Sequence, residues 1–141
     1  MDRKIVRDIH IVSNKLCRKT DQVMNRYGCT HSQYAVMVYL VKNNKKDIFQ
    51  KDIEEKFEIR RSSVSAILTH LEKKGFIKRD SVLHDARLKK ISPTPDGIKM
   101  VEDTVKFLQD FEKSLLSDIS DEDLDIFYSV LFRLAYTVDI I

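Results

Sequence analysis

Residues 60–92 bring small polar side chains and basic side chains together in a pattern that suits contact with a large polar partner. Ser62, Ser65, Ala66 and Thr69 recur at intervals of three and four, so they would share one side of a helix. An exposed helix face usually carries long charged side chains. Short ones let another molecule approach the backbone closely, and their hydroxyl groups can both donate and accept hydrogen bonds.

The motifs of common enzyme classes are missing from the sequence. It contains no G-x-S-x-G, no H-E-x-x-H, no C-x-x-C and no glycine-rich phosphate loop. Gly28, Gly75 and Gly97 fall beside the expected ends or starts of helices, and the four histidines lack the close spacing of metal ligands. We therefore expect no enzyme activity, no metal and no cofactor. A small hydrolase would require a reactive serine that no motif marks.

The composition is that of one soluble globular domain, with 141 residues, 43% of them hydrophobic and 33% charged. The longest apolar run, residues 34–41, is far shorter than the roughly 18 residues that span a bilayer. Charged residues near the amino terminus break up any signal peptide. Two cysteines, Cys17 and Cys29, form no disulfide framework. We expect a cytoplasmic protein without a membrane partner.

The net charge of +3 is unevenly distributed along the chain. Residues 1–44 carry 8 basic and 3 acidic side chains, and residues 45–92 carry 13 and 8, so each segment has a net charge of +5. Residues 93–141 carry 4 and 11, a net charge of −7. A basic middle segment favours a polyanionic partner, although solvation of exposed helix faces would produce charges there as well.

Hydrophobic periodicity predicts a mainly α (α+β) fold with six helices and one β-hairpin. The expected elements are helices at about 5–27, 34–42, 50–57 and 61–74, strands at 76–79 and 87–91, and helices from about 94 and from about 121. Thr30 and Gln33 have the spacing of a capping box. Two helices joined by a short turn and followed by a hairpin form a winged helix-turn-helix.

The long helices on either side of this unit carry apolar stripes. In the fifth helix the stripe is expected at Ile98, Val101, Val105, Leu108, Leu115 and Ile119. The last helix also has Ile126, Val130 and Phe132 outside its own stripe, and a second copy of the chain would cover such a surface, although a deep position within one monomer would also do so. The residues expected at a dimer interface are Ile5, Ile9, Val12, Leu124, Phe127, Leu131, Leu134 and Val138.

Four motifs occur in an order that resembles the MarR family of bacterial transcription regulators. They are the threonine three residues before Gln33, the segment LEKKGFIKR at 71–79, Asp85-Ala86-Arg87, and TPDG at 94–97. The resemblance covers nearly the whole chain and implies a single domain over 1–141, with a DNA-binding lobe at 30–92 and dimerisation helices at 1–28 and 94–141. Departures are Glu54 and Glu58, where alanine and glycine are usual, and Pro93 in place of leucine.

The resemblance also implies a mode of action. The chain would form a homodimer that binds an operator in double-stranded DNA, with the helix from about 61 to 74 in the major groove and the hairpin reaching the neighbouring minor groove. Members of the family commonly repress operons for drug efflux, stress or catabolism. Many release DNA when they bind a small, often aromatic, anion.

Individual contacts with DNA can be assigned from side-chain chemistry. Short side chains let the helix approach base edges, Ala66 suits a thymine methyl, and Arg61 suits phosphate or guanine. Arg87 suits a narrow minor groove, and Asp85 would hold the wing by pairing with Arg87 or Arg79. The residues expected at the DNA interface are Arg60, Arg61, Ser62, Ser63, Ser65, Ala66, Thr69, His70, Lys73, Arg79, His84, Asp85, Arg87 and Lys89, with Lys90 adding attraction to phosphate.

Two alternatives stay open from the sequence. The protein could be a winged-helix dimerisation or adaptor protein without DNA binding, although the basic residues between 60 and 90 argue against it. It could also be a regulator that senses oxidants through Cys17, which lies beside Arg18 and Lys19. An effector pocket would lie where the first two helices and the fifth helix meet the DNA-reading lobe. Tyr27, Tyr34 and Met37 are candidates for its lining, but the core is the favoured place for each of them.

Overall fold

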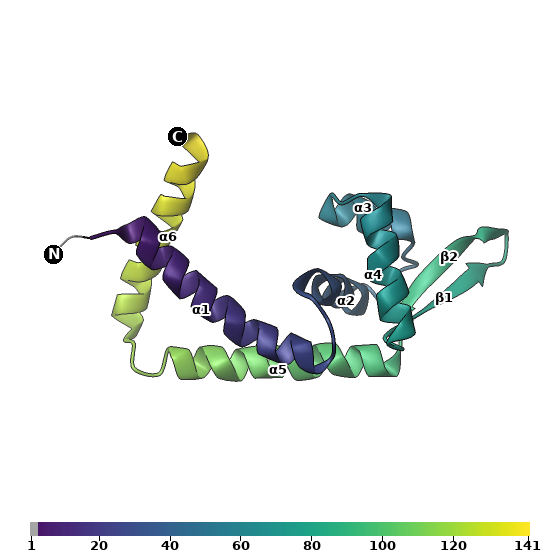
Figure 1. Ribbon diagram of the computed structural model, residues 1–141, viewed down its shortest axis with the longest axis horizontal. Helices are drawn as coiled ribbons and strands as arrows, with labels where there is room; N and C mark the ends of the chain where they lie inside the picture. The colour runs from purple at the N-terminus through teal and green to yellow at the C-terminus, as the bar shows by residue number, and fades with distance from the viewer. Residues whose placement is uncertain (1–2) are drawn as a thin grey trace. The chain divides into compact units, whose positions relative to one another are not determined.

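The computed structural model describes residues 3–141 (Figure 1). These residues have the predicted mainly helical architecture with one β-hairpin. The elements in chain order are α1 (Ile5–Arg26), α2 (His31–Lys42), α3 (Gln50–Phe57), α4 (Arg61–Lys73), β1 (Ile77–Val82), β2 (Asp85–Pro93), α5 (Pro95–Leu115) and α6 (Asp121–Ile140). The predicted winged helix-turn-helix is thus confirmed. The chain divides into two compact units within α5, the first ending at Phe107 and the second covering Leu108–Ile141.

The core of the first unit surrounds α2. Met37 and Leu40 of this helix have no exposed surface, and α2 packs against α1, α4 and β2. Helices α3 and α4 add Ile53, Leu68 and Leu71, which are also fully buried. Burial of each such side chain contributes about 1.5–3 kcal/mol before the cost of ordering the chain. The nearly all-apolar sequence of α2 therefore has the central position that its composition predicted.

The ends of the core helices follow the predicted capping chemistry. The Thr30 backbone amide donates to Gln33 Oε1 over 2.9 Å, and the Gln33 amide donates to Thr30 Oγ1 over 3.3 Å, which completes the capping box of α2. Gly28 ends α1 with φ of 64°, a left-handed conformation that suits glycine. At the start of α5, Thr94 Oγ1 accepts the Gly97 amide over 3.2 Å.

Helix α5 passes very close to the junction between α4 and β1. A Cβ atom added at Gly97 would lie 2.1 Å from the carbonyl oxygen of Phe76. The Thr94 hydroxyl also donates to the Gly75 carbonyl over 2.5 Å, and its backbone amide donates to the Phe76 carbonyl over 3.0 Å. This junction fixes the start of the hairpin relative to α4 and α5.

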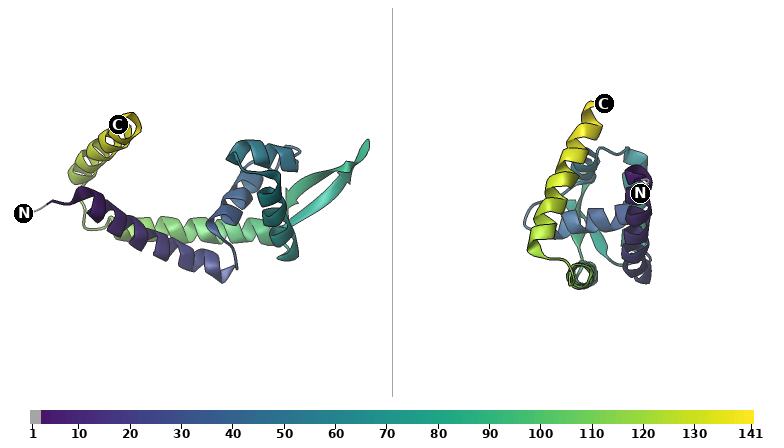
Figure 2. Two further views of the ribbon diagram at one scale, coloured as in Figure 1. Left: turned by 45° about the horizontal axis from the view of Figure 1, so that its top comes forward. Right: turned by 90° about the vertical axis from the view of Figure 1, so that its left-hand side faces the viewer.

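The hairpin is longer than predicted, because β1 and β2 continue beyond 76–79 and 87–91. The strands pair antiparallel with Arg79 opposite Ile91, and a register shift occurs between Ser81 and Val82. Exposed charged residues occupy most of the outer part, so no apolar alternation marks it in the sequence. At its base, the Ile91 amide donates to the Ile48 carbonyl over 2.8 Å, which ties the hairpin to the segment before α3. Figures 1 and 2 show the hairpin running on from the end of α4.

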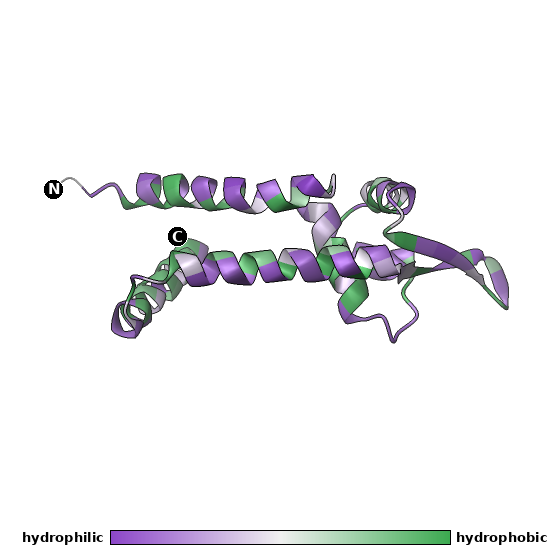
Figure 3. Cartoon of the chain, turned by 90° about the horizontal axis from the view of Figure 1, so that it is seen from below, coloured by the Kyte–Doolittle hydropathy of each residue, from purple (hydrophilic) through white to green (hydrophobic). Residues whose placement is uncertain are grey.

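The predicted apolar stripe of α5 needs correction. Val105 is exposed and Ile119 lies beyond the helix, which ends at Leu115. The buried residues include Met100, Val101 and Thr104. Thr104 is hidden from a hydrophobicity pattern, but its hydroxyl donates to the Met100 carbonyl over 2.8 Å and is satisfied inside the core. In the second unit, α6 has no buried residue, and Figure 3 shows hydrophobic residues along much of its length.

Candidate nucleic-acid interface

One face of α4 packs into the core, and the opposite face carries short side chains. Val64, Leu68 and Leu71 are fully buried, as the spacing predicted. The outward residues Ser62, Ser63, Ala66 and Thr69 are exposed, whereas Ser65 is half-buried. The exposed face therefore has the short side chains that close approach of a partner requires.

The start of α4 is open to an anion. Arg60 precedes the helix in an extended conformation and makes no side-chain cap, and both Arg60 and Arg61 are exposed. The first backbone amides of a helix lack intrahelical acceptors and carry the positive end of the helix dipole. Two arginines beside these amides form a site that favours phosphate.

Gln50 is a residue of this surface that sequence reasoning missed. It is the first residue of α3, and its Nε2 donates to Ser65 Oγ over 2.8 Å and to the Arg61 carbonyl over 3.2 Å. The amide thereby links the start of α3 to the exposed side of α4. No local pattern announces this bond, because its partners lie 11 and 15 residues away in the sequence.

Arg79, which was predicted to contact DNA, forms hydrogen bonds within the protein. Its Nε donates to Glu72 Oε2 over 3.2 Å, and its Nη2 lies 3.4 Å from Thr69 Oγ1. The side chain of Arg79 is only 23% exposed. Arg79 thus joins β1 to α4, and direct contact with DNA would require its guanidinium to serve both roles.

The prediction that Asp85 pairs with an arginine side chain is wrong. Asp85 Oδ1 instead accepts the backbone amide of Arg87 over 2.9 Å. A short carboxylate two residues before an amide favours such a local turn over an ion pair with a long flexible side chain. Asp85 therefore shapes the hairpin turn, and the exposed guanidinium of Arg87 has no ion-pair partner among the residues that the structure describes.

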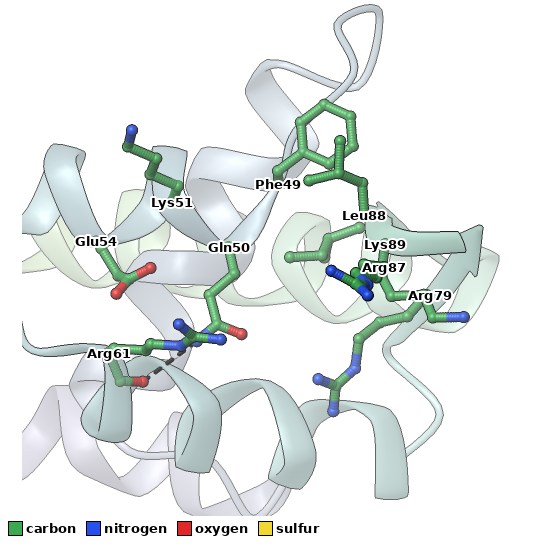
Figure 4. Close-up of a pocket in the computed structure, with 10 residues that line it drawn as sticks. Phe49, Gln50, Lys51, Glu54, Arg61, Arg79, Arg87, Leu88 and Lys89 are labelled. Carbon is green, nitrogen blue, oxygen red and sulfur yellow. Dashed lines mark hydrogen bonds between the residues drawn. The ribbon is translucent and has the colours of Figure 1, made fainter. Parts of the chain in front are cut away.

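A hollow of about 450 Å³ lies between α3, α4 and the hairpin (Figure 4). It is lined by Phe49, Gln50, Lys51, Glu54, Arg61, Arg79, Arg87, Leu88, Lys89 and Ile91. Figure 4 shows Arg61 and Arg87 extending toward this space from α4 and from the hairpin. Since the lining includes Lys51, Lys89 and three arginines but only one carboxylate, that of Glu54, the hollow favours anions.

The remaining predicted contact residues fall into two groups. Lys73 and His84 are exposed, and Lys89 is exposed with its Nζ 2.6 Å from Ser81 Oγ. His70 is half-buried, and its Nε2 lies 2.8 Å from the Gly28 carbonyl oxygen. The His70 ring is thus turned toward the turn between α1 and α2, which argues against the predicted phosphate contact.

The residues predicted at a dimer interface are mostly exposed in the single chain. Ile5, Ile9 and Val12 in α1 are 55%, 44% and 55% exposed. In α6, Phe127, Leu131 and Val138 are exposed, whereas Leu124 and Leu134 are half-buried. Water-exposed apolar side chains in such numbers are costly unless a partner covers them.

The cysteines and the proposed effector residues occupy distinct environments. Met37 is fully buried and Tyr34 packs against the core. The Tyr27 hydroxyl donates to Asp103 Oδ2 over 2.8 Å. Cys17 is exposed, whereas Cys29 is buried and its burial raises the pKa of the thiol, an effect that Lys74 partly opposes. Met37 is therefore a core residue, and Tyr34 packs against the core.

The described residues contain neither a candidate metal site nor a candidate membrane-spanning helix. No cluster of three or more histidine, cysteine, aspartate or glutamate side chains is arranged to hold a metal ion there. Among the helices described, none combines the length and the apolar character needed to cross a membrane.

This chain is a winged-helix protein, because it combines a helix-turn-helix with a β-hairpin. Its basic hairpin and the short polar side chains of α4 form a surface suited to a polyanion. Residues 27–88, from the end of α1 to the hairpin, match the model of the MarR family. The resemblance to the MarR family that the motifs indicated is thus confirmed over residues 27–88.

Relatives and solved structures agree with this assignment. The chain is 28% identical to the HTH-type transcriptional regulator PapX of Escherichia coli over 116 residues, which are 82% of this chain and 71% of PapX. It is similar to MepR, a transcription regulator of the Staphylococcus aureus multidrug efflux pump MepA, with a TM-score of 0.82, 25% identity and coverage of 96% and 99% of the two chains. A MepR–DNA complex aligns with a TM-score of 0.79 and 27% identity over 92% of this chain and 96% of that one.

Proposed function

We propose that this regulator is a homodimer that binds a palindromic operator in double-stranded DNA and represses transcription by blocking access of polymerase. One observation carries the proposal: the exposed short side chains of α4 lie beside a hollow whose lining includes Arg61 and Arg87. This combination supplies base contact and phosphate attraction on one surface. The solved complex of MepR with DNA supports the same role for the related fold.

In this proposal α4 enters the major groove and the hairpin reaches the adjacent minor groove. Ser62, Ala66 and Thr69 are short enough to bring base edges within reach of the helix. Arg60, Arg61 and the first amides of α4 hold a phosphate. Arg87 enters the minor groove, since Asp85 binds the backbone of the hairpin and leaves the Arg87 guanidinium available.

The proposed dimer uses the exposed apolar residues of α1 and α6. Residues 30–92 then form the DNA-binding lobe, with 1–28 and 94–141 as dimerisation segments. Two lobes related by a two-fold axis would bind half-sites roughly 34 Å apart, one turn of duplex. A palindrome follows from that symmetry.

We further propose that a small aromatic anion releases the dimer from DNA. The relation to MepR, whose name connects it with a multidrug efflux pump, supports a small-molecule effector. The regulator acts in the cytoplasm, where its DNA is found, and needs neither metal nor catalytic activity for this role.

The proposal is tested by fluorescence anisotropy with duplex DNA from the region upstream of the protein's own gene, at about 50 mM and about 200 mM salt. Specific binding should weaken with salt at a log–log slope of about −0.9 for each phosphate neutralised, and scrambled DNA should bind more weakly. Size-exclusion chromatography with light scattering should report a dimer. Absence of binding to either DNA would instead support the adaptor alternative, and equal affinity for both DNAs would contradict a sequence-specific regulator.

A further inference from the structure

Gln50 reaches from α3 to the exposed side of α4 and contacts two groups there with one nitrogen atom. Its Nε2 lies 2.8 Å from Ser65 Oγ and 3.2 Å from the carbonyl oxygen of Arg61. Both Gln50 and Ser65 are half-buried, so the bond between their side chains is partly shielded from water, whereas the bond to the Arg61 carbonyl is exposed. Figure 4 shows the Gln50 side chain between α3 and α4, with the bond to Arg61 drawn.

The Arg61 carbonyl determines which way the Gln50 amide faces. A backbone carbonyl only accepts hydrogen bonds, so the atom of Gln50 beside it must be the NH₂ nitrogen. The same nitrogen donates to Ser65, and Ser65 Oγ is therefore an acceptor in this pair. The Ser65 hydroxyl keeps its own hydrogen for another partner.

A serine inside a helix often donates that hydrogen to the carbonyl four residues earlier, as Thr104 does to Met100. For Ser65 this carbonyl belongs to Arg61, whose oxygen accepts the Gln50 side chain in addition to the Ser65 backbone amide of the helix, so both of its lone pairs are in use. In the part of the chain that the structure describes, no acceptor is bonded to the Ser65 hydroxyl. Its donor is thus left for a molecule that approaches α4.

We propose that Gln50 is a positioning residue that makes Ser65 a hydrogen-bond donor toward a base edge of bound DNA, an inference that rests on the proposed function. The groups that satisfy such a donor in the major groove are purine N7, guanine O6 and thymine O4. An amino group of adenine or cytosine at the same place does not satisfy it. One position of each half-site should therefore favour a base acceptor because of Gln50, although Gln50 itself need not touch DNA.

Ser65 is better placed for a base than for a phosphate. It lies one helical turn beyond Arg61, and it shares a side of the helix with Ser62 and Thr69, which are three residues before it and four after it. The cationic side chains that would hold phosphate gather at the start of α4 and on the hairpin. A short hydroxyl in the middle of a recognition helix reaches bases only when the backbone comes close, which this face permits.

The experiment is selection of bound duplexes from a random library, followed by sequencing, for the full-length dimer and four variants. The variants are Gln50→Ala, Ser65→Ala, the double variant and Gln50→Glu. Lys51→Ala serves as the matched control, because Lys51 is the next residue of α3 and lines the same hollow. Thermal melting checks that each variant is folded.

We expect Gln50→Ala and Ser65→Ala to relax the base preference at the same half-site position, by roughly five- to tenfold each. The double variant should relax it no further, since both changes remove one interaction. Gln50→Glu replaces the donor by an acceptor, so Ser65 would donate to the carboxylate and the preference at that position should move toward amino groups. Lys51→Ala should weaken binding to all sequences by the same factor and leave the base preference at every position unchanged.

Three outcomes would overturn the inference. Gln50→Ala could weaken binding to every sequence by the same factor, which would assign it a structural or phosphate-directed role. It could relax a different position from Ser65→Ala. If the wild-type protein enriched no sequence at all, the proposed function would fail with it, and this result is distinct from the first two. Should Gln50→Ala unfold, Gln50→Glu and Ser65→Ala still decide whether one position responds to both residues.

Discussion

His70 of α4 is hydrogen-bonded to Gly28, because its Nε2 lies 2.8 Å from the Gly28 carbonyl oxygen. The carbonyl only accepts, so Nε2 carries the hydrogen in this contact. The bond connects α4 with the turn between α1 and α2. A residue predicted to hold phosphate thus supports the packing of α4 instead.

His70→Ala should lower the free energy of unfolding by about 1 kcal/mol, since it removes one partly shielded hydrogen bond. The salt dependence of DNA binding should keep its slope, because no phosphate contact is lost. Urea unfolding and anisotropy titrations measure the two quantities. His84→Ala is the matched control, as His84 is exposed in the hairpin turn, and its stability should change by less than about 0.5 kcal/mol. A slope reduced by about 0.9 in His70→Ala would restore the phosphate assignment.

Arg87→Ala should weaken operator binding by about 1–3 kcal/mol and leave the dimer intact. The reason is that Arg87 is exposed on β2 and Asp85 binds the Arg87 backbone amide, so the guanidinium makes no hydrogen bond or ion pair with the described residues. Anisotropy gives the affinity and light scattering the oligomeric state. Arg18→Ala, an exposed arginine of α1, should bind as the wild type does. Unchanged affinity in Arg87→Ala would remove this residue from the interface.

Local sequence patterns predicted the helices well because the physical causes are local. Thr30 and Gln33 lie three residues apart and cap α2 by themselves, and Gly28 ends α1 through its own backbone freedom. The hairpin was predicted too short because its outer strands are exposed on both faces and have no apolar alternation. The predicted stripe of α5 wrongly included Val105, which is exposed, and it omitted the buried Thr104, whose hydroxyl donates to a backbone carbonyl.

The candidate interface was predicted in outline but not in its internal contacts. The short residues of α4 are visible as a pattern in the sequence, and the structure leaves most of them exposed. The Gln50–Ser65 and His70–Gly28 bonds join residues 15 and 42 positions apart, so only the packed fold reveals them. The Asp85 turn was within reach of sequence reasoning, because a carboxylate two residues before an amide is a known local motif.

Glu58→Gly should raise the free energy of unfolding by about 0.5–1 kcal/mol. Glu58 ends α3 with φ of 52°, and a left-handed conformation strains any residue with a Cβ atom. Urea unfolding midpoints measure the change. Glu55→Gly, inside α3, should instead lower stability by about 1 kcal/mol, and a loss of stability in both variants would contradict the assignment of strain.

Asp103→Asn should lower stability at neutral pH and lose this effect in acid. The hydrogen bond from Lys99, and after it the one from Tyr27, holds the pKa of Asp103 below its ordinary value of 3.8. A lowered folded pKa stabilises the fold above the unfolded pKa, and this contribution disappears as the pH falls through the folded value. Urea midpoints from about pH 7 to about pH 3 should therefore converge for variant and wild type. Asp110→Asn is the control, and a constant difference at every pH would contradict the linkage.

The two thiols should differ in reactivity in a way that decides the oxidant-sensing alternative. Cys17 is exposed, whereas burial shields Cys29 and raises the pKa of its thiol. Iodoacetamide at about pH 7.5 should therefore alkylate Cys17 in the folded protein and reach Cys29 only after unfolding, as mass spectrometry of peptides will report. Peroxide treatment should leave operator affinity unchanged, because no second thiol lies exposed beside Cys17 among the described residues. If peroxide weakened DNA binding by the wild type but not by Cys17→Ser, the protein would be a redox sensor.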